Sequence, residues 1–509
     1  MDENVKDALG TSPGEEGFHP DQLDRMVITP PLLFSLQDPD SNNQFFDVII
    51  DLNLDYPAGR DGARKRVCLL IAEAGGDEAA KTIRSGGTDP TQPFIFAKLA
   101  GSVIKAIVAE DRADQLTRAE TSPGSLSMMR GAIYRVWEDS EIHPLITKSI
   151  ATVKADAAQA AYSAFGRDIV WAVLDSGIEG NHVHFDSYRN LQPPKPVDHK
   201  DFTQSAGGAL SDPYGHGTHV AGIIAGKMSL SEQDPPRLVM SKIRDENDQT
   251  ITQTMPLWAI RGMAPECKLV SLKVLDDQGR GRVSNIIDAI QEIQRVNDYG
   301  RRIQIHGINL SVGYDFNPKW FACGQSPLCV EVDRLVRSGV AVVVAAGNTG
   351  YGWSQSLQRG NVAAGLTLSI NDPGNSELAI TVGSTHRDMP HTYGVSYFSS
   401  KGPTGDGRAK PDLVAPGERI ISCAAGCTRL LDDKNADNTQ VDYREDSGTS
   451  MAAPHVSGII AAFFSIRREF IGRPEELKAI LLSTATDLKR ERSFQGAGLV
   501  DLMRAIQSV

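Results

Sequence analysis

Beyond about residue 150, short apolar runs alternate with stretches in which apolar residues recur at helical spacing. The runs predict strands buried on both faces of a sheet, and they read IVWAVLD, KLVSLKVL, HGINLSVG and VAVVVAAG. The stretches between them predict helices, and they read HGTHVAGIIAGK, VSNIIDAIQEIQRV and VEVDRLVRSG. This alternation is typical of βαβ units, so residues 148–509 are predicted to form an α/β domain with a doubly wound, mostly parallel sheet flanked by helices.

The preceding part of the chain shows two other patterns. Residues 1–43 are rich in Pro, Gly, Asp and Glu and have little apolar periodicity, which predicts a polar N-terminal arm. Residues 44–147 mix the two periodicities and predict a small α+β domain. Its expected elements are a strand in FFDVIIDLNL, a helix in RDGARKRVCLLIAEAG, one or two strands in FIFAKLAGSVIKAIVAE, a helix in DRADQLTRAE and a strand in IYRVWED.

One stretch interrupts the rhythm of the larger domain. Residues 228–258 are polar and rich in turn-forming residues, which predicts a surface insertion.

Length, charge and cysteine content narrow the class of protein. At 509 residues the chain exceeds one ordinary core, and its formal net charge of −12 argues against a nucleic-acid partner, which would require clustered positive charge. The first residues show no basic start followed by an apolar run, and no segment is expected to span a membrane. Six cysteines are too sparse for a disulfide scaffold, so we expect reduced thiols and a cytoplasmic location.

Three short segments beside the predicted strands and helices carry an acid, a base and a nucleophile. They are LDSG with Asp175, GHGTHVAGIIAG with His216, and GTSMAAPHVSG with Ser450. A serine hydroxyl needs an imidazole to accept its proton, and the imidazole needs a carboxylate to fix its tautomer. Ser450 also precedes a predicted helix, whose first N–H groups would face an oxyanion formed on attack. The three residues therefore predict a catalytic triad.

A fourth polar group follows the long apolar run VAVVVAAG. Asn348 stands directly after Gly347, where its amide could donate to the same oxyanion. The segment INLSVG ends in Gly313 and suits a strand edge that pairs with an extended peptide.

Together these segments resemble the subtilisin-like serine protease family, the subtilases, over about residues 165–505. The resemblance rests on the order Asp, His, Ser and on DSG, GHGTHVAGIIAG, AAGN and GTSMAAPHVSG. It implies a serine endopeptidase that forms an acyl-enzyme on Ser450 and acts on proteins or peptides. It also implies a specificity pocket that favours apolar side chains, lined by Asn309, Leu310, Ser311, Val312, Gly313, Ala345, Ala346 and Gly347.

Residues 44–147 resemble the propeptide domain of the same family more loosely. Such a domain assists folding and inhibits the protease, so the resemblance implies a zymogen with a processing site between about Asp139 and Asp156. A regulatory protein partner is a further hypothesis.

Other Cys, Asp and His residues have possible metal-binding or structural roles. The CAAGC of Cys423 and Cys427 could be half of a metal site, but no second pair lies at zinc spacing, and no metal site is predicted. Acidic loop residues could bind calcium as in some subtilases, although their spacing follows no calcium-loop pattern; these are Asp432, Asp433, Asp437 and Asp442. No cofactor is otherwise expected. Packing or capping roles are expected for His182, His184, His219 and His455.

Two other functional classes share these residues. A silent scaffold could keep the fold to bind a partner, but such proteins usually lose a triad residue, and none is lost here. An acyl transferase would use the same triad and would differ in how water is excluded from the acyl-enzyme, so product mass separates it from a hydrolase.

Overall fold

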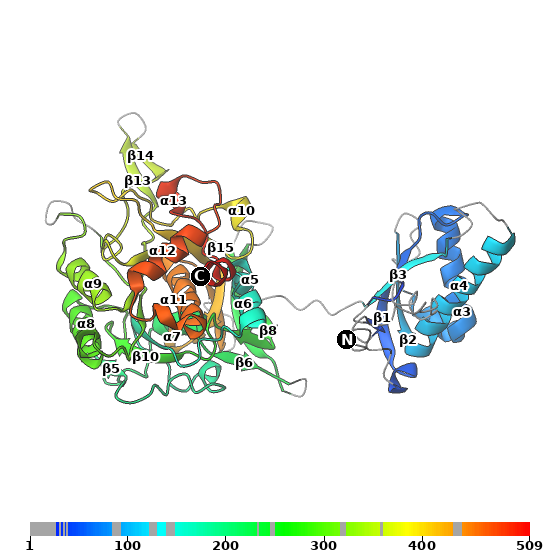
Figure 1. Ribbon diagram of the computed structural model, residues 1–509, viewed down its shortest axis with the longest axis horizontal. Coiled ribbons are helices and arrows are strands. Elements are labelled where there is room, and N and C mark those ends of the chain that lie inside the picture. Colours follow the sequence, from blue (N-terminus) through cyan, green and yellow to red (C-terminus); the bar gives the residue numbers. More distant parts are fainter. Residues whose placement is uncertain are drawn as a thin grey trace, which may run out of the picture. The chain divides into compact units, whose positions relative to one another are not determined.

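A computed structural model of the chain shows two compact units, Met1–Pro144 and Leu145–Val509 (Figure 1). The structure describes residues 27–29, 32, 33, 36, 39–83, 93–121, 130–138, 148–231, 234–244, 250–315, 322–356, 360–430 and 440–509.

The smaller unit contains an antiparallel sheet of order β2-β1-β3 and two long helices. The elements are η1 (Pro39–Asn42), β1 (Phe45–Leu52), α3 (Gly59–Lys81), β2 (Phe94–Ala100), α4 (Gly101–Thr121) and β3 (Ile133–Glu138). Alternate residues of β1 are buried, so one face of the sheet packs against the helices in a shared apolar core. The other face carries aromatic side chains that stay exposed, among them Phe94 and Trp137.

The prediction of strands throughout FIFAKLAGSVIKAIVAE was wrong beyond Ala100. A single helix, α4, begins at Gly101 and runs through the expected separate helix to Thr121. The buried residues Val103, Ile104, Ile107 and Val108 show why, because offsets of one, four and five residues place them on one face of a helix. Their high content of β-branched residues had favoured strands.

Part of the expected polar arm, residues 1–43, belongs to the core of the smaller unit. Ile28, Leu32 and Leu36 are buried in the core of the smaller unit, and Ile28 pairs with Val136 of β3. Their four-residue spacing is an apolar signal that was missed among the prolines and acidic residues around them.

The larger unit is built on a seven-stranded parallel sheet, which confirms the predicted doubly wound α/β fold. Its strand order is β16-β15-β12-β11-β4-β10-β5. The strands are β4 (Val170–Asp175), β5 (Lys200–Asp201), β10 (Lys268–Lys273), β11 (Gly307–Leu310), β12 (Ala341–Ala345), β15 (Ile380–His386) and β16 (Leu413–Glu418).

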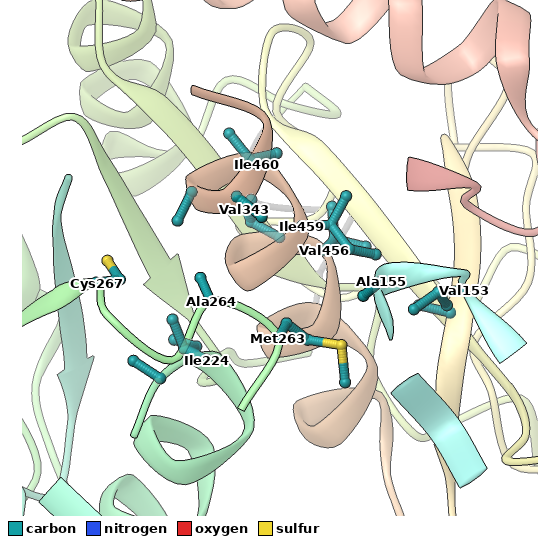
Figure 2. Packing of buried hydrophobic residues seen from close by; sticks show 14 of the residues in the cluster. Val153, Ala155, Ile224, Met263, Ala264, Cys267, Val343, Val456, Ile459 and Ile460 are labelled. Atoms are coloured by element: carbon teal, nitrogen blue, oxygen red, sulfur yellow. The ribbon is translucent and has the colours of Figure 1, made fainter. Parts of the chain in front are cut away.

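Helices cover both faces of this sheet. Successive residues of β4 alternate between two cores: Trp171 and Val173 lie in one, and Ala172 and Leu174 in the other. The first core is covered by α7 (His216–Ile224) and α11 (Thr449–Ile466), and the second by α8 (Val283–Val296) and α9 (Pro327–Arg337). Figure 2 shows Val456, Ile459 and Ile460 of α11 packed beside Val343 of β12. A strand buried on both sides has no polar face, which explains the apolar runs in the sequence.

The topology fixes where a ligand can bind. From β4 the chain adds β5 and β10 on one side and then crosses to add β11 and β12 on the other. The carboxyl ends of β4, β11 and β12 therefore open a crevice at the point where the direction of winding reverses.

The stretch 228–258, expected to be turn-rich, contains a regular hairpin. Strands β7 (Arg237–Arg244) and β8 (Thr250–Leu257) pair in full register and extend a four-stranded sheet of order β17-β18-β7-β8. β7 pairs with β18 (Tyr443–Asp446), the strand that leads directly to Ser450. The alternating polar and apolar residues of RLVMSKIR, typical of a strand, were the signal.

The remaining elements are shorter and surround this framework. They are α5 (Lys148–Thr152), α6 (Ala155–Tyr162), η3 (Val183–Phe185), β6 (Lys227–Ser229), β9 (Ala259–Arg261), η4 (Asp298–Gly300), β13 (Tyr351–Ser356), β14 (Gly360–Gly365), α10 (Pro390–Tyr393), β17 (Ile420–Cys423), η5 (Gly426–Arg429), η6 (Arg468–Phe470), α12 (Pro474–Thr484), α13 (Arg492–Gln495) and α14 (Leu502–Gln507).

Helix α11 is the one helix in the described ranges that is long and apolar enough to cross a membrane. It is 83% buried inside the larger unit, where it contacts strands β11, β12, β15 and β16. These contacts give it the character of a core helix.

Stability should depend on the helix-to-sheet packing. Ile290→Ala removes a fully buried side chain of α8 and should lower the free energy of unfolding by about 2–5 kcal/mol. Asp288→Ala, on the exposed side of the same helix, should change it by less than about 0.5 kcal/mol. Both would be measured by chemical denaturation in a Ser450→Ala background that avoids self-digestion. Equal losses for the two variants would contradict the packing described.

Candidate active site

Asp175 and His216 are joined by a hydrogen bond between the sheet and a helix. Asp175 is the last residue of β4 and is 1% exposed, and His216 is the first residue of α7. The Nδ1 atom of His216 lies 2.8 Å from Oδ1 of Asp175. This contact makes Nδ1 the protonated ring nitrogen of a neutral His216 and leaves Nε2 as the basic one.

A buried network holds the loop before His216 in place. The carboxylate of Asp212 accepts hydrogen bonds from the N–H groups of Gly215 and Thr218 and from the hydroxyl of Ser176. Gly217 packs so closely on this turn that an added Cβ would lie 2.1 Å from the carbonyl oxygen of Gly177. The glycines of GHG thus allow α7 to start directly beside the end of β4.

The charges around His216 make its imidazole a stronger base. Burial lowers the pKa of His216, but the negative charges of Asp175, Asp446 and Asp212 outweigh it and raise the pKa to about 9. An imidazolium formed during a reaction would be stabilised by the same carboxylates.

Ser450 is the second residue of α11, so its backbone N–H is one of the first four of the helix and has no partner within it. Its Oγ donates to the carbonyl oxygen of Ser311 over 3.0 Å. Within the described ranges no hydrogen bond joins Ser450 to His216, although both line one cleft. For His216 to accept its proton, the Ser450 hydroxyl would first have to leave the Ser311 carbonyl oxygen; catalytic hydrogen bonds are often not yet formed in unliganded sites.

The side-chain amide of Asn348 has a fixed orientation. Its Oδ1 accepts hydrogen bonds from the N–H of Thr449 at 2.9 Å and from the hydroxyl of Thr449 at 3.1 Å. Because a backbone N–H can only donate, the oxygen must face Thr449 and the NH₂ group must face away from it. An added Cβ on Gly448 would lie 3.4 Å from Nδ2, so this donor lies beside the N-terminus of α11. Asn348 Nδ2 and the Ser450 N–H can thus serve one oxyanion.

The cleft around these groups has a volume of about 530 Å³. Of the eight residues expected to bind substrate, five line it: Ser311, Val312, Gly313, Ala345 and Gly347. The segment 311–313 runs beyond the paired part of β11, which supports its expected role as an edge for an extended peptide.

The other three expected substrate-binding residues lie elsewhere. Leu310 and Ala346 are buried apolar residues, and Asn309 is fully buried behind the cleft. The hydroxyl of Ser457 donates to Asn309 Oδ1, whose amide in turn donates to Ser311 Oγ. The Ser311 hydroxyl donates onward to the carbonyl oxygen of Ser450. Asn309 therefore ties the end of β11 to α11 and lies buried behind Ser311.

Much of the cleft wall was not singled out from the sequence. The residues that were not expected there are Tyr214, Leu275, Gly279, Gly281, Arg282, Val283, Ile286, Tyr314, Thr349 and Asn371. Several of them follow β10, and the rule that chemistry lies beyond strand ends could have found them.

The remaining histidines have structural surroundings. Burial lowers the pKa of His184 to about 3 and those of His219 and His455 to about 4. Each contacts a backbone carbonyl oxygen: His182 that of Asp442, His184 that of Gly222, His219 that of Arg444 and His455 that of Met451. Such contacts are typical of packed histidines.

The side chains that most often bind metal ions are dispersed in the described part of the chain. The described residues contain no cluster of three His, Cys, Asp or Glu side chains suited to an ion. The carboxylate of Asp442 is paired with Arg429 at 2.7 Å and with Arg237 at 3.4 Å. The other three acidic candidates for calcium, Asp432, Asp433 and Asp437, lie outside the described residues. Cys423 is buried and Cys427 exposed, and both are free thiols.

Comparison with known proteins agrees with the fold and the cleft. The Subtilase family of peptidases matches residues 166–499, so the chain belongs to this family. It is accordingly a subtilisin-like serine endopeptidase, a hydrolase.

Three relatives illustrate the extent of the similarity. The chain is 27% identical to serine protease AprX of Bacillus subtilis, over 76% of this chain and 78% of AprX. It is 30% identical to the major intracellular serine protease of B. subtilis, over 66% of this chain and 82% of that protein. It is 31% identical to pyrolysin of Pyrococcus furiosus over 58% of this chain, but this covers only 21% of pyrolysin.

The orientation of Asn348 leads to a kinetic prediction. Asn348→Ala removes the Nδ2 donor and should lower kcat by about 10²- to 10³-fold with little change in KM, because an oxyanion forms only during the reaction. Steady-state kinetics on a peptide substrate would measure both. A rise in KM alone would instead make Asn348 a contact of the bound substrate.

The pH dependence should follow the charge around His216. Only neutral imidazole accepts a proton, so kcat/KM should rise as the pH increases through the His216 pKa, in the alkaline range near 9. Asp446→Asn removes a negative charge that raises this pKa, so the rising limb should shift to lower pH. Asp288→Asn, an equal charge change on the exposed side of α8, should leave the limb in place. Identical profiles for wild type and Asp446→Asn would contradict this account.

Proposed function

We propose that this protease cleaves peptide bonds through an acyl-enzyme on Ser450, with Asp175, His216 and Ser450 as its catalytic triad. The observation that carries the proposal is the 2.8 Å contact between Asp175 and His216 in the cleft that Ser450 and Asn348 also line. A neutral His216 with a free Nε2 is what a serine nucleophile requires.

The proposed reaction proceeds in two halves. His216 Nε2 takes the Ser450 proton as Oγ attacks the substrate carbonyl carbon, and the oxyanion accepts hydrogen bonds from Asn348 Nδ2 and the Ser450 N–H. His216 then gives this proton to the leaving amine, and the C–N bond breaks. His216 next takes a proton from water as the water oxygen attacks the ester carbonyl carbon, and it gives this proton to Ser450 Oγ as the ester C–O bond breaks. Asp175 orients the imidazole and stabilises its charged form throughout.

We also propose that the N-terminal unit restrains the protease until the chain is cleaved between the two units. The support is that residues 39–83, 93–121 and 130–138 form a unit with its own core. The open face of its sheet also exposes Phe94 and Trp137, which suits a surface that binds protein. The candidate processing region lies partly in residues 139–147, outside the described residues.

An intracellular site of action is part of the same proposal. All six cysteines are free, and Cys267, Cys329 and Cys423 are buried, which fits a reducing compartment. A related protease of B. subtilis is named an intracellular one.

The triad can be tested by substitution. Ser450→Ala and His216→Ala should each lower peptide hydrolysis by about 10⁴-fold or more. Ser450→Ala should leave the unfolding transition nearly unchanged, because its side chain fills no core, whereas His216→Ala should lower stability, because it removes the partner of the buried Asp175 carboxylate. Product masses should show one water added per cleaved bond. Wild-type turnover in either folded variant would exclude the triad, and coupled peptides as main products would indicate acyl transfer.

Restraint by the N-terminal unit requires a separate experiment. A recognition site for an unrelated protease, placed within residues 139–147, would allow cleavage at will. Cleavage should raise activity several-fold if the N-terminal unit is inhibitory, and the same treatment of protein without the added site should have no effect. Equal activity before and after complete cleavage would contradict restraint.

A further inference from the structure

The cleft continues from Ser450 along the loop that joins β10 to α8. This wall is lined by Leu275, Gly279, Gly281, Arg282, Val283 and Ile286. A substrate bound at Ser450 and extended along the cleft would meet this loop with a side chain some distance from the bond that is cleaved.

The loop is a fixed structure. The carboxylate of Asp276 accepts hydrogen bonds from the N–H groups of Gln278 and Arg280, each 2.9 Å long, and Leu275 pairs with Gly281. Gly279 has a φ of +75°, and an added Cβ would lie 2.5 Å from the ring of Tyr214. The tyrosine ring therefore packs on the loop from the His216 side, and the wall does not need to form when substrate arrives.

Arg282 gives this wall its charge. Arg282 is the N-cap residue of α8 and has an extended backbone. Its side chain is exposed and makes no capping hydrogen bond. Among the described residues that line the cleft, Arg282 and His216 are the only ones of the types Arg, Lys, His, Asp and Glu. No carboxylate of the described chain forms an ion pair with it. The cleft therefore carries an unneutralised cation in a protein whose net charge is −12.

The neighbouring Arg280 is also exposed, but it has side-chain partners and does not line the cleft. Its guanidinium contacts Asp276 at 3.5 Å and Gln278 Oε1 at 3.0 Å, and it is not among the residues that line the cleft. Two arginines two residues apart thus have different surroundings, and one of them is available to a ligand.

We propose that Arg282 makes the protease prefer substrates with an Asp or Glu side chain away from the cleaved bond, where the peptide passes the start of α8. This inference rests on the proposed function, because it assigns a substrate class to the same cleft. A guanidinium binds a carboxylate through two parallel hydrogen bonds, and an exposed pair of this kind gives a preference of about fivefold. Salt should weaken the preference, because the pair faces solvent.

The test is a positional scan with synthetic peptides. A neutral parent peptide receives Glu, Gln or Lys at each position in turn on both sides of the cleaved bond, and kcat/KM is measured for each. In the wild type, Glu should exceed Gln about fivefold at one position or two neighbouring ones, Lys should fall below Gln, and about 1 M salt should remove most of the difference. The Glu-to-Gln ratio is independent of how much enzyme is folded.

Three variants identify the responsible residue. Arg282→Gln should bring the Glu-to-Gln ratio to about one, and Arg282→Glu should reverse the preference in favour of Lys. Arg280→Gln should keep the wild-type ratio, because that arginine does not line the cleft. The inference is wrong if no position prefers Glu in the wild type, or if Arg282→Gln retains the preference, or if Arg280→Gln loses it equally.

The neutral parent peptide shows whether a negative result concerns only the role of Arg282 or also the proposed protease activity. Cleavage of the neutral peptide by wild type but not by Ser450→Ala, without any charge preference, would overturn only the role of Arg282. Absence of cleavage of every peptide, with no activated serine detected, would overturn both.

Discussion

The hydrogen bond between Asp175 and His216 forms at the carboxyl edge of the parallel sheet, and the rest of the candidate site is built around this edge. A buried carboxylate needs a partner, and Asp175 lies at 1% exposure with His216 as its partner at 2.8 Å. The partner can reach it because the winding direction of the sheet reverses beside β4 and opens a crevice there. The buried carboxylate of Asp212 then holds the N-terminus of α7 against this edge.

The nucleophile is held to the same edge from the other side of the crevice. Helix α11 is buried along nearly its whole length, and the Ser457, Asn309 and Ser311 side chains link it to β11 by hydrogen bonds. Asn348, following β12, is fixed by Thr449 at the start of the same helix. The four proposed catalytic groups thus come from elements whose relative positions are set by apolar packing and by buried polar contacts, which is how a site is preorganised before substrate binds.

The sequence allowed the sheet, its main helices and the candidate site residues to be predicted, because apolar runs and glycine-flanked polar residues are local signals. The sequence was less informative for residues whose structure or position is set by contacts with distant parts of the chain. Val103 to Val108 suggested strands through β-branched composition, although their spacing suits a helix. Asn309 looked like a cleft residue, but it lies buried behind Ser311 and is tied to α11. The wall near Arg282 appears only once β10 and α8 are placed beside the crevice.

Ser450 is the activated nucleophile in the proposed mechanism, and chemical labelling tests this most directly. The intact protein would be treated with a fluorophosphonate, its mass measured and the modified residue located by peptide mapping. One label per chain on Ser450, absent in His216→Ala, is the result the geometry predicts. An enzyme that hydrolyses peptides yet takes its label on another residue, or takes none, would contradict the assignment of the triad.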